Sequence, residues 1–220
     1  MEKRICYLIG AGEPYIPDTL PPRKEVLVIA ADGGYLLAQR LFGEPDLAVG
    51  DFDSLGYLPK EVEVITHPSE KDDTDMALAA ELAIAGGARE LVLLGALGGR
   101  LDHTVANLQL LASLAARGVR ATAVGADGVA VTALVGGECA CFPSSAHGTL
   151  SVFAFGGNAE GVTLKGLRYP LCESRLTPCY PLGISNELMG EEASISLREG
   201  TLLLFYPQKT FATPTIKKRK

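Results

Sequence analysis

Six apolar runs dominate the first 124 residues of the chain, and each is followed by a turn that carries glycine or charged side chains. After residues 34, 75 and 101 the apolar residues recur with helical spacing instead. Strands that alternate with helices assemble into a mostly parallel sheet with helices on both faces, a doubly wound α/β domain. The predicted strands lie at residues 4–9, 25–31, 47–49, 62–66, 91–94 and 119–124.

The pattern changes after Asp127 and Gly128 to short alternating segments that are separated by turns. Such a pattern is typical of an antiparallel sandwich or barrel. We therefore predict an α/β domain at 1–127 and an all-β, sandwich-like domain at 128–220. Residues 166–192 are expected to form one long irregular loop, and loops of that length are often functional. The predicted strands of this half lie at 129–135, 138–142, 148–155, 160–165, 193–198 and 201–206.

Composition excludes several classes of partner. The net charge of −6 argues against a nucleic-acid binder, and the basic run at 217–220 is expected to be a frayed, solvated terminus. No apolar stretch reaches the roughly 18 residues of a membrane span, and the N-terminus lacks a signal-peptide pattern. We therefore expect a cytoplasmic protein that binds neither membrane nor nucleic acid.

The five cysteines are odd in number and contain no Cys-x-x-Cys pair. They therefore indicate neither a disulfide framework nor a zinc site, and they fit a reducing compartment. Cys139 and Cys141 alternate with apolar residues and are expected to be ordinary strand residues.

Asp51 and Asp53 follow the apolar run at 47–49, and in extended chain they point to the same side. Two like charges on one side repel unless a cation lies between them. A hard divalent ion with oxygen ligands is the natural candidate. The pair therefore predicts a Mg²⁺ site at the end of a strand, which a purely structural role for the acids does not explain.

A second group of acids lies where a helix is expected to begin, at Asp72, Asp73 and Asp75. Capping and the helix dipole explain one or two acids at such a position. Three acids beside Lys71 are more than capping requires. Asp72 and Asp75 are therefore candidates for the same site as the first pair.

Other polar residues also follow predicted strands. Asp32 either caps the next helix or meets a ligand at the carboxyl end of a parallel strand. Arg100 offers a forked cation that suits a phosphate group. Asp102 opens the last predicted helix, and His103 is either a base, a ligand or a residue that makes a local hydrogen bond.

The first turn, at residues 10–14, reads Gly-Ala-Gly-Glu-Pro. It is not a dinucleotide-binding fingerprint, because the third glycine is missing, and it is not a Walker A loop, because Gly-Lys-Ser/Thr is missing. It is either a tight strand-end turn or a loop that faces a phosphate, and the sequence favours neither.

Carboxylates at strand ends with cations nearby suit phosphoryl transfer. A metal ion neutralises phosphate charge, Lys71 and Arg100 bind the phosphates, and a spare carboxylate orients or deprotonates an attacking hydroxyl. Glycoside hydrolysis by two carboxylates would leave the glycine loops and the cations without a role. The Ser, Cys and His residues form no credible nucleophilic triad.

In their order and spacing, four motifs resemble those of the thiamine pyrophosphokinase family. They are Asp32-Gly33-Gly34, Gly50-Asp51-Phe52-Asp53-Ser54, Lys71-Asp72-Asp73-Thr74-Asp75 and Gly99-Arg100-Leu101-Asp102-His103. Residues 161–167 and 183–187 resemble the thiamine-binding C-terminal domain of that family. The resemblance covers most of residues 5–206.

The resemblance implies transfer of the pyrophosphoryl group of ATP to the hydroxyl of thiamine, with Mg²⁺, giving thiamine diphosphate and AMP. It also implies a homodimer with thiamine at the subunit interface. It makes Asp51, Asp53 and Asp75 the metal ligands and adds Asp72 and Asp102 to them as catalytic candidates. The implied substrate- and ATP-binding residues are Asp32, Lys71, Arg100, His103, Asn107, Ser185 and Asn186.

The chain contains no tryptophan, so a ring that stacks on thiamine is expected to be Tyr169, Tyr180 or Tyr206. Two other hypotheses stay open at this point. One is a different Mg²⁺-dependent phosphotransferase or phosphohydrolase on the same scaffold, against which the segment 183–187 argues. The other is a thiamine- or nucleotide-binding sensor without turnover, against which the full set of acids argues.

Overall fold

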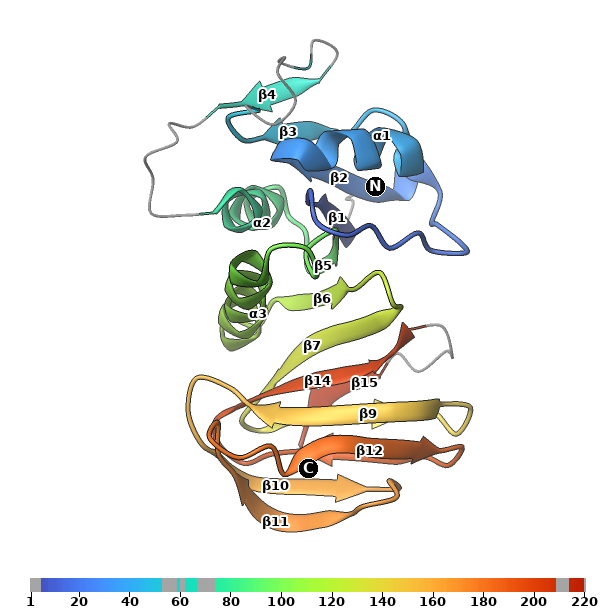
Figure 1. The fold of residues 1–220 in the computed structure, drawn as a ribbon, viewed down its shortest axis with the longest axis vertical. Helices are drawn as coiled ribbons and strands as arrows, with labels where there is room; N and C mark the ends of the chain where they lie inside the picture. The colour runs from blue at the N-terminus through green and yellow to red at the C-terminus, as the bar shows by residue number, and fades with distance from the viewer. Residues whose placement is uncertain (1–4, 53–58, 60–61, 67–73, 209–213, 220) are drawn as a thin grey trace. The chain divides into compact units, whose positions relative to one another are not determined.

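The structure is a computed structural model that describes residues 5–52, 59, 62–66, 74–208 and 214–219 (Figure 1). The chain divides into two compact units. The first unit consists of residues up to 110 together with 119–127, and the second consists of 111–118 together with the residues from 128 onward. Asp53, Lys71, Asp72 and Asp73 lie outside the described residues.

The described residues of the first unit form a parallel sheet with the strand order β6-β5-β1-β2-β3-β4. Every neighbouring pair in this order is parallel. The strands are β1 (Ile5–Ile9), β2 (Val26–Ala31), β3 (Leu47–Val49), β4 (Glu63–Ile65), β5 (Glu90–Leu94) and β6 (Arg120–Val124).

Strand register brings the carboxyl ends of the strands to one edge of the sheet. Ile9 is the partner of both Ala30 and Leu94, and Val49 is the partner of Ala31. The segments that follow these strands therefore begin at the same level. This alignment is what collects residues from distant parts of the sequence around one site.

Helices cover both faces of this sheet. They are α1 (Tyr35–Phe42), α2 (Asp75–Ala85) and α3 (Leu101–Ala116), with short 3₁₀ turns η1 (Arg23–Glu25) and η2 (Asp32–Gly34). The connection through α1 runs from β2 to β3, whereas those through α2 and α3 run in the opposite direction across the sheet. Right-handed crossovers therefore place α1 on one face and α2 and α3 on the other (Figure 1).

The centre of the sheet is fully buried, as the unbroken apolar runs predict. Leu8 on β1 and Leu93 on β5 have no exposed surface. Burial of each such side chain contributes about 1.5–3 kcal/mol. A rigid core therefore lies directly beneath the segments that follow the strands.

The described residues of the second unit form two antiparallel groups of strands, with the orders β12-β9-β14-β7 and β11-β10-β13-β8-β15. The fold class predicted from the sequence, α/β followed by all-β, is confirmed. The strands are β7 (Val129–Val135), β8 (Glu138–Phe142), β9 (His147–Ala154), β10 (Ala159–Lys165), β11 (Leu171–Leu176), β12 (Gly183–Met189), β13 (Ala193–Ser196), β14 (Thr201–Pro207) and β15 (Thr215–Lys218).

The expected loop at 166–192 is wrong, because β11 and β12 lie within it. Both are the outermost strands of their groups, and both pair with register shifts rather than in a regular ladder. Backbone hydrogen bonds hold such strands without a clean apolar alternation, so the sequence pattern misses them.

The expected frayed terminus is also corrected. Thr215–Lys218 form β15, which pairs antiparallel with β8 from Cys141 to Glu138. This strand is rich in lysine, and charged side chains are common on outermost strands because they discourage further strand pairing.

Candidate nucleotide site

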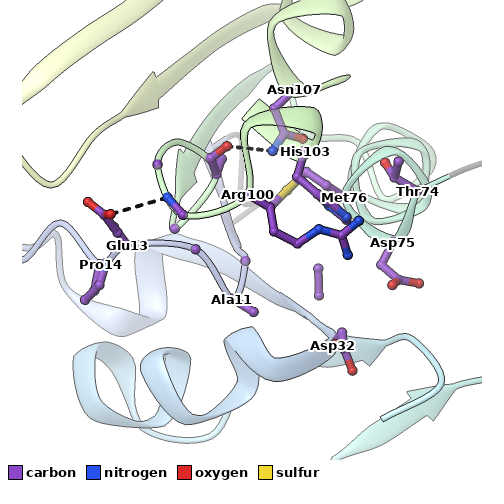
Figure 2. Close-up of a pocket in the computed structure, with 17 residues that line it drawn as sticks. Ala11, Glu13, Pro14, Asp32, Thr74, Asp75, Met76, Arg100, His103 and Asn107 are labelled. Carbon is purple, nitrogen blue, oxygen red and sulfur yellow. Dashed lines mark hydrogen bonds between the residues drawn. The ribbon is translucent and has the colours of Figure 1, made fainter. Parts of the chain in front are cut away.

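A cavity of about 630 Å³ lies where the carboxyl ends of β1, β2 and β5 meet (Figure 2). Four segments line it: the turn after β1, the end of β2 with Asp32, the start of α2, and the chain from Gly95 into α3. Its lining residues all belong to the first unit. The lining residues are Gly10–Pro14, Ala31, Asp32, Thr74–Met76, Gly95, Ala96, Gly98–Arg100, His103 and Asn107.

Two glycine turns meet backbone to backbone at this cavity. The N–H of Gly10 donates to the carbonyl of Leu94, and the N–H of Gly12 donates to the carbonyl of Gly95, both at 2.8 Å. A Cβ atom on Gly95 would lie 2.3 Å from the carbonyl oxygen of Gly10, and Gly95 has a φ of 62°. Only glycine fits there, and it leaves backbone exposed to a ligand without intervening side chains.

Glu13 ties the first turn to the turn that precedes α3. Its Oε1 accepts a hydrogen bond from the N–H of Gly99 at 3.3 Å (Figure 2). A Cβ atom on Gly98 would lie 3.0 Å from the Glu13 carboxyl group. The sequence around Glu13 does not predict this contact, because the partner of Glu13 is 86 residues away.

The structure places Asp32 and Asp75 on the lining of the cavity. Asp32 has a left-handed backbone, with φ of 46°, and begins η2. Asp32 does not cap the following helix, because the N-cap residue of α1 is Gly34. Figure 2 shows both carboxylates on the same side of the cavity.

Helix capping does not account for Asp75. The N-cap of α2 is Thr74, whose hydroxyl accepts from the N–H of Ala77 at 3.2 Å. Asp75 is the first residue of the helix, where the dipole favours a negative charge. The Asp75 carboxylate therefore lies at the edge of the cavity in the favourable field of the helix dipole, while Thr74 makes the capping hydrogen bond.

Asp51 lies two residues beyond the end of β3 and is exposed, outside the lining of the cavity. The next residue, Phe52, is 2 % exposed and has a φ of 56°. A left-handed residue at this position turns the chain sharply after the strand. The burial of the Phe52 ring fixes the position of the backbone that carries Asp51.

Arg100 extends across the cavity toward the side on which Asp32 and Asp75 lie (Figure 2). Its Nη2 is 2.6 Å from Oδ2 of Asp102, and both side chains are mostly exposed. This hydrogen bond, more than the charge itself, lowers the pKa of Asp102 and raises that of Arg100. Asp102 does not line the cavity, so its contact in the structure is with the cation that does.

His103 lines the cavity from the first turn of α3. Asn107, one turn further on, is 6 % exposed, and its Nδ2 donates to the carbonyl of Ala96 at 2.6 Å. Asn107 therefore holds the second glycine turn against α3.

Within the part of the chain that the structure describes, no three His, Cys, Asp or Glu side chains converge closely enough to hold a metal ion. Three carboxylates line the cavity: Glu13 accepts from the N–H of Gly99, which leaves Asp32 and Asp75 as the carboxylate donors on the opposite side. Mg²⁺ commonly takes one or two carboxylates and completes its shell with water and substrate phosphates. This donor set therefore fits Mg²⁺ with a phosphorylated ligand, and it does not fit a closed protein cage.

The predicted thiamine-binding residues, Ser185 and Asn186, lie on β12 in the second unit. Asn186 is 3 % exposed, and its amide group bridges the backbone of Tyr169. Oδ1 accepts from the Tyr169 N–H at 3.0 Å, and Nδ2 donates to the Tyr169 carbonyl at 2.7 Å. Asn186 therefore positions another residue, whereas Ser185 is exposed and left-handed, with φ of 56°.

Three tyrosines were candidates to stack on a ring, and burial separates them. Tyr206 is 1 % exposed, whereas Tyr169 is 56 % and Tyr180 is 68 % exposed. The Arg168 guanidinium lies 5.6 Å from the centre of the Tyr169 ring and pairs with Glu187 at 2.9 Å. Tyr169 is therefore exposed and also held in place.

A parallel sheet with glycine turns, carboxylates and an arginine at its strand ends defines a class of α/β proteins that bind phosphorylated nucleotides. Two family models narrow the class. "Thiamin pyrophosphokinase, catalytic domain" matches residues 22–123, and "Thiamin pyrophosphokinase, vitamin B1 binding domain" matches residues 142–202. The chain belongs to the thiamin pyrophosphokinase family, whose members are ATP-dependent thiamine diphosphokinases.

Relatives match along most of the chain. The thiamine pyrophosphokinase of Bacillus subtilis is 27% identical over 209 residues, which are 92% of this chain and 97% of that protein. Its crystal structure superposes with a TM-score of 0.78, at 26% identity over 92% of this chain and 98% of that one. The enzyme of Geobacillus thermodenitrificans gives 0.73, at 29% identity over 92% and 97%. These comparisons favour neither of the two other hypotheses.

Within the described residues, no helix is both long and apolar enough to span a membrane.

Proposed function

We propose that the protein transfers the pyrophosphoryl group of ATP to the hydroxyl group of thiamine, with Mg²⁺, and releases thiamine diphosphate and AMP. The observation that carries this proposal is the cavity at the ends of β1, β2 and β5, lined by two glycine turns, the carboxylates of Glu13, Asp32 and Asp75, and Arg100. All its lining residues except Gly10–Pro14 lie within residues 22–123, which the catalytic-domain model matches.

The glycine turns are proposed to face the phosphates of ATP. At Gly10, Gly12 and Gly95 the backbone carries no side chain that would hold a triphosphate away. Arg100 lines the same cavity and supplies a cation with a forked set of donors. Lys71 is proposed as a second phosphate-binding cation, and Asp32, His103 and Asn107 shape the remaining wall.

Asp51, Asp53 and Asp75 are proposed to hold Mg²⁺ together with the phosphates, and Asp32, which lies on the same side of the cavity as Asp75, offers a further oxygen donor. The bound ion would neutralise charge on the transferred group. Among these acids Asp75 has the clearest position, because it lies on the cavity wall at the positive end of α2. Its carboxylate is oriented by the helix that begins at that residue.

The chain must also remove a proton from the attacking hydroxyl of thiamine. A carboxylate within hydrogen-bond reach of that hydroxyl is suited to the task. The candidates are Asp51, Asp53, Asp72, Asp75 and Asp102. Asp102 is the least suited among those described, because its carboxylate is engaged by Arg100 at 2.6 Å.

Residues 1–127 are proposed as the catalytic, ATP- and Mg²⁺-binding domain, and residues 128–220 as the thiamine-binding and dimerisation domain. The match of 142–202 to the vitamin B1 binding model supports the second assignment. Ser185 is proposed to contact thiamine directly. Asn186 is proposed to act through Tyr169, whose exposed ring is available to stack on the vitamin.

The proposed assembly is a cytoplasmic homodimer with thiamine at the subunit interface. Exposed apolar side chains on and before β12 support an interface on this strand: Tyr180, Leu182, Ile184 and Met189 are about half exposed or more. Sedimentation at a series of protein concentrations, with activity measured in parallel, tests the proposal. Full activity of a monomer would contradict a substrate site shared between subunits.

A product assay tests the reaction. The protein is incubated with thiamine, ATP and Mg²⁺, and nucleotides and thiamine esters are separated. AMP and thiamine diphosphate are expected in equal amounts, with no product in EDTA and none without thiamine. ADP with thiamine monophosphate would place attack on the γ-phosphorus and contradict pyrophosphoryl transfer.

A further inference from the structure

A second cavity, of about 430 Å³, lies in the second unit and shares no residue with the nucleotide site. Strands β8, β10, β11, β13 and β15 and the residue after β15 contribute its lining. Cys139, Cys141 and Cys172 line it together with Lys217, Arg219 and Glu173. The cavity thus combines soft sulfur groups with cations in a protein whose net charge is −6.

Cys139 and Cys141 lie side by side on β8. They are two residues apart in a strand, so their side chains leave the same face. Their Sγ atoms are 3.8 Å apart. Both residues are half-buried, whereas Glu138 and Ala140, which point to the opposite face, are buried.

The register of β15 places a cation next to this pair of thiols. Lys217 is the direct partner of Cys139 across the two strands. Cross-strand partners on one face have Cβ atoms about 4.5–5.5 Å apart, so the lysine stem begins beside the thiol. On the other side of β8, Ser196 of β13 is the partner of Cys139.

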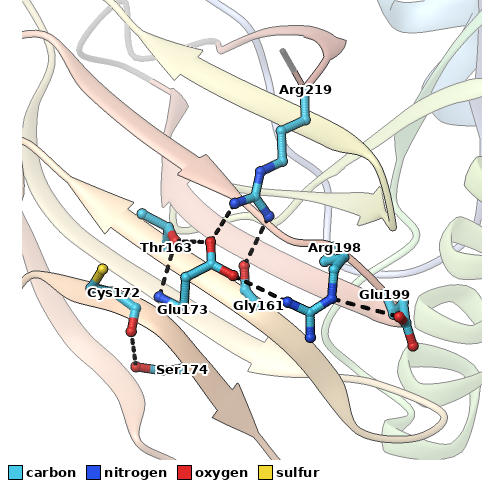
Figure 3. Close-up of polar contacts among 8 residues, drawn as sticks. All are labelled: Gly161, Thr163, Cys172, Glu173, Ser174, Arg198, Glu199 and Arg219. Carbon is cyan, nitrogen blue, oxygen red and sulfur yellow. Dashed lines mark hydrogen bonds and ion pairs between the residues drawn. The ribbon is translucent and has the colours of Figure 1, made fainter.

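Contacts among neighbouring strands fix four charged side chains of this unit (Figure 3). The Arg219 guanidinium donates to Glu173 and, at 3.2 Å, to the carbonyl of Gly161. Glu173 also pairs with Arg198 at 3.2 Å. Arg198 pairs in turn with Glu199 at 3.6 Å, so these four charges balance, and the excess positive charge at the cavity comes from Lys165, Lys217 and Lys218 on its lining.

The spacing of the thiols suits a bridging cation better than a disulfide. A disulfide brings sulfur atoms to about 2.05 Å and Cα atoms usually within about 6.8 Å. Two residues of extended strand span about 6.6 Å, at the upper end of that range. Two bonds of the zinc–sulfur length, about 2.3 Å, reach up to about 4.6 Å, so an ion that lies off the line between the two sulfur atoms can bridge the 3.8 Å between them.

The number of ligands narrows the class of ion. Among the described residues, no third His, Cys, Asp or Glu joins the two thiols in a cluster that could hold a metal. Two protein ligands are too few for the tetrahedral site that Zn²⁺ prefers. Soft thiolate ligands in low number select Cu(I) among the metals common in cells.

We propose that Cys139 and Cys141 together bind one soft, monovalent, thiophilic cation of the Cu(I) class, with Lys217 and the other lysines of the lining balancing the excess charge of the two thiolates. Two metal–sulfur bonds form, two thiol protons pass to solvent, and no atom changes its oxidation state. The resulting bis-thiolate complex carries one negative charge, which the neighbouring cations stabilise. The site does not depend on the proposed reaction at the nucleotide site.

A competition titration tests the proposal. The reduced full-length chain is titrated anaerobically with Cu(I) in the presence of a chromogenic Cu(I) chelator such as bicinchoninate. The wild type is expected to withdraw one equivalent. Cys139→Ser and Cys141→Ser are each expected to weaken binding about 100-fold, and Lys217→Gln about tenfold, within the range for loss of groups around a metal.

Cys172→Ser and Cys179→Ser are the matched controls and are expected to bind as the wild type does. Circular dichroism and the activity of the metal-free variants report whether each one folds. Wild-type affinity in Cys139→Ser or Cys141→Ser would overturn the proposal. Loss of binding in Cys172→Ser, or failure of the wild type to compete with the chelator, would overturn it as well.

A measurement on the wild type alone covers the case in which a variant fails to fold. Phenylarsine oxide reacts with two adjacent thiols, forming two As–S bonds and releasing the oxide oxygen with both protons as water. One arsenical per chain is expected, on the peptide that contains Cys139 and Cys141. Attachment to another peptide, or no attachment, would contradict a paired-thiol site.

Discussion

The nucleotide site and the candidate thiamine site place their polar groups in different ways. In the first unit, Asp32, Asp75 and Arg100 lie in turns and helix starts that follow parallel strands. In the second unit, Ser185 and Asn186 lie within a strand. The parallel order of the strands and their aligned ends bring the first set together at one edge of the sheet, whereas in the second unit register decides which face and which contacts each residue has. The comparison shows that polar side chains in turns can line a site directly. A polar side chain within a strand acts through an additional contact, such as the hydrogen bonds between the Asn186 amide and the Tyr169 backbone.

The largest expected effect is on catalysis at the first site. Asp75→Asn keeps the shape of the side chain and removes its charge at the cavity wall. We expect kcat/KM to fall about 10³-fold, equivalent to about 4 kcal/mol of transition-state stabilisation. Steady-state kinetics with both substrates measures the loss. Asp127→Asn, an exposed acid outside the cavity, is the control, and equal activity of the two variants would contradict the assigned role.

The next effect concerns the backbone contact that builds the same site. Gly95→Ala would place a Cβ atom 2.3 Å from the carbonyl of Gly10 at a φ of 62°. We expect a loss of about 2–4 kcal/mol, the sum of backbone strain and overpacking. Urea unfolding measures it.

Gly99→Ala is the matched control for that variant, because φ there is 65° and no atom lies within 4 Å of the added Cβ. We expect it to lose about 1 kcal/mol, the cost of backbone strain alone. Equal losses of stability in Gly95→Ala and Gly99→Ala would contradict a stabilising role for the close packing of the two turns.

In the second unit, adjacent residues are expected to have separate effects. Asn186→Ala leaves the backbone groups of Tyr169 without their partner, which costs about 1–3 kcal/mol. Ser185→Ala leaves stability unchanged within about 0.5 kcal/mol and raises the KM for thiamine more than the KM for ATP. Urea unfolding and kinetics distinguish the two. An equal rise in both KM values for Ser185→Ala would argue against contact with thiamine.

The smallest expected effect is on the pH dependence of folding stability, and each unit contains an exposed carboxylate that contributes to it. The hydrogen bond from Arg100 lowers the pKa of Asp102, and that from Arg219 lowers the pKa of Glu173. Because the pKa of each carboxyl group is lowered in the folded state, each pair makes its full contribution to folding stability above the ordinary carboxyl pKa of about 4. It is lost as the pH falls through the folded pKa. Carboxyl ¹³C NMR titration checks this, and ordinary values for both groups would contradict the pairs.

Much of the first unit follows from the sequence, for a physical reason. Runs such as residues 91–94 are apolar throughout because the strand is buried on both faces. The turns at strand ends then meet because parallel strands share a direction. The sequence does not predict contacts between distant turns, such as the hydrogen bond between Glu13 and Gly99.

The second unit was harder to predict because its outer strands lack the apolar alternation of buried ones. β11 has only one buried residue, Leu176, at its end. β12 begins at a glycine and contains the left-handed Ser185. Asn186 was predicted to bind thiamine directly, and the structure shows its amide engaged by the Tyr169 backbone. Only the register of the strand reveals that arrangement.

Backbone amide NMR with an inert nucleotide tests the central claim most directly. In α,β-methylene-ATP the bond that pyrophosphoryl transfer breaks is replaced, so the analogue binds without turnover. With Mg²⁺ present, we predict shifts at the turns 10–12 and 95–99 and at Asp32 and Asp75. Thiamine added alone is predicted to shift residues 169 and 185 instead. Nucleotide shifts confined to the second unit, with the turns unchanged, would contradict the assignment of the cavity to ATP.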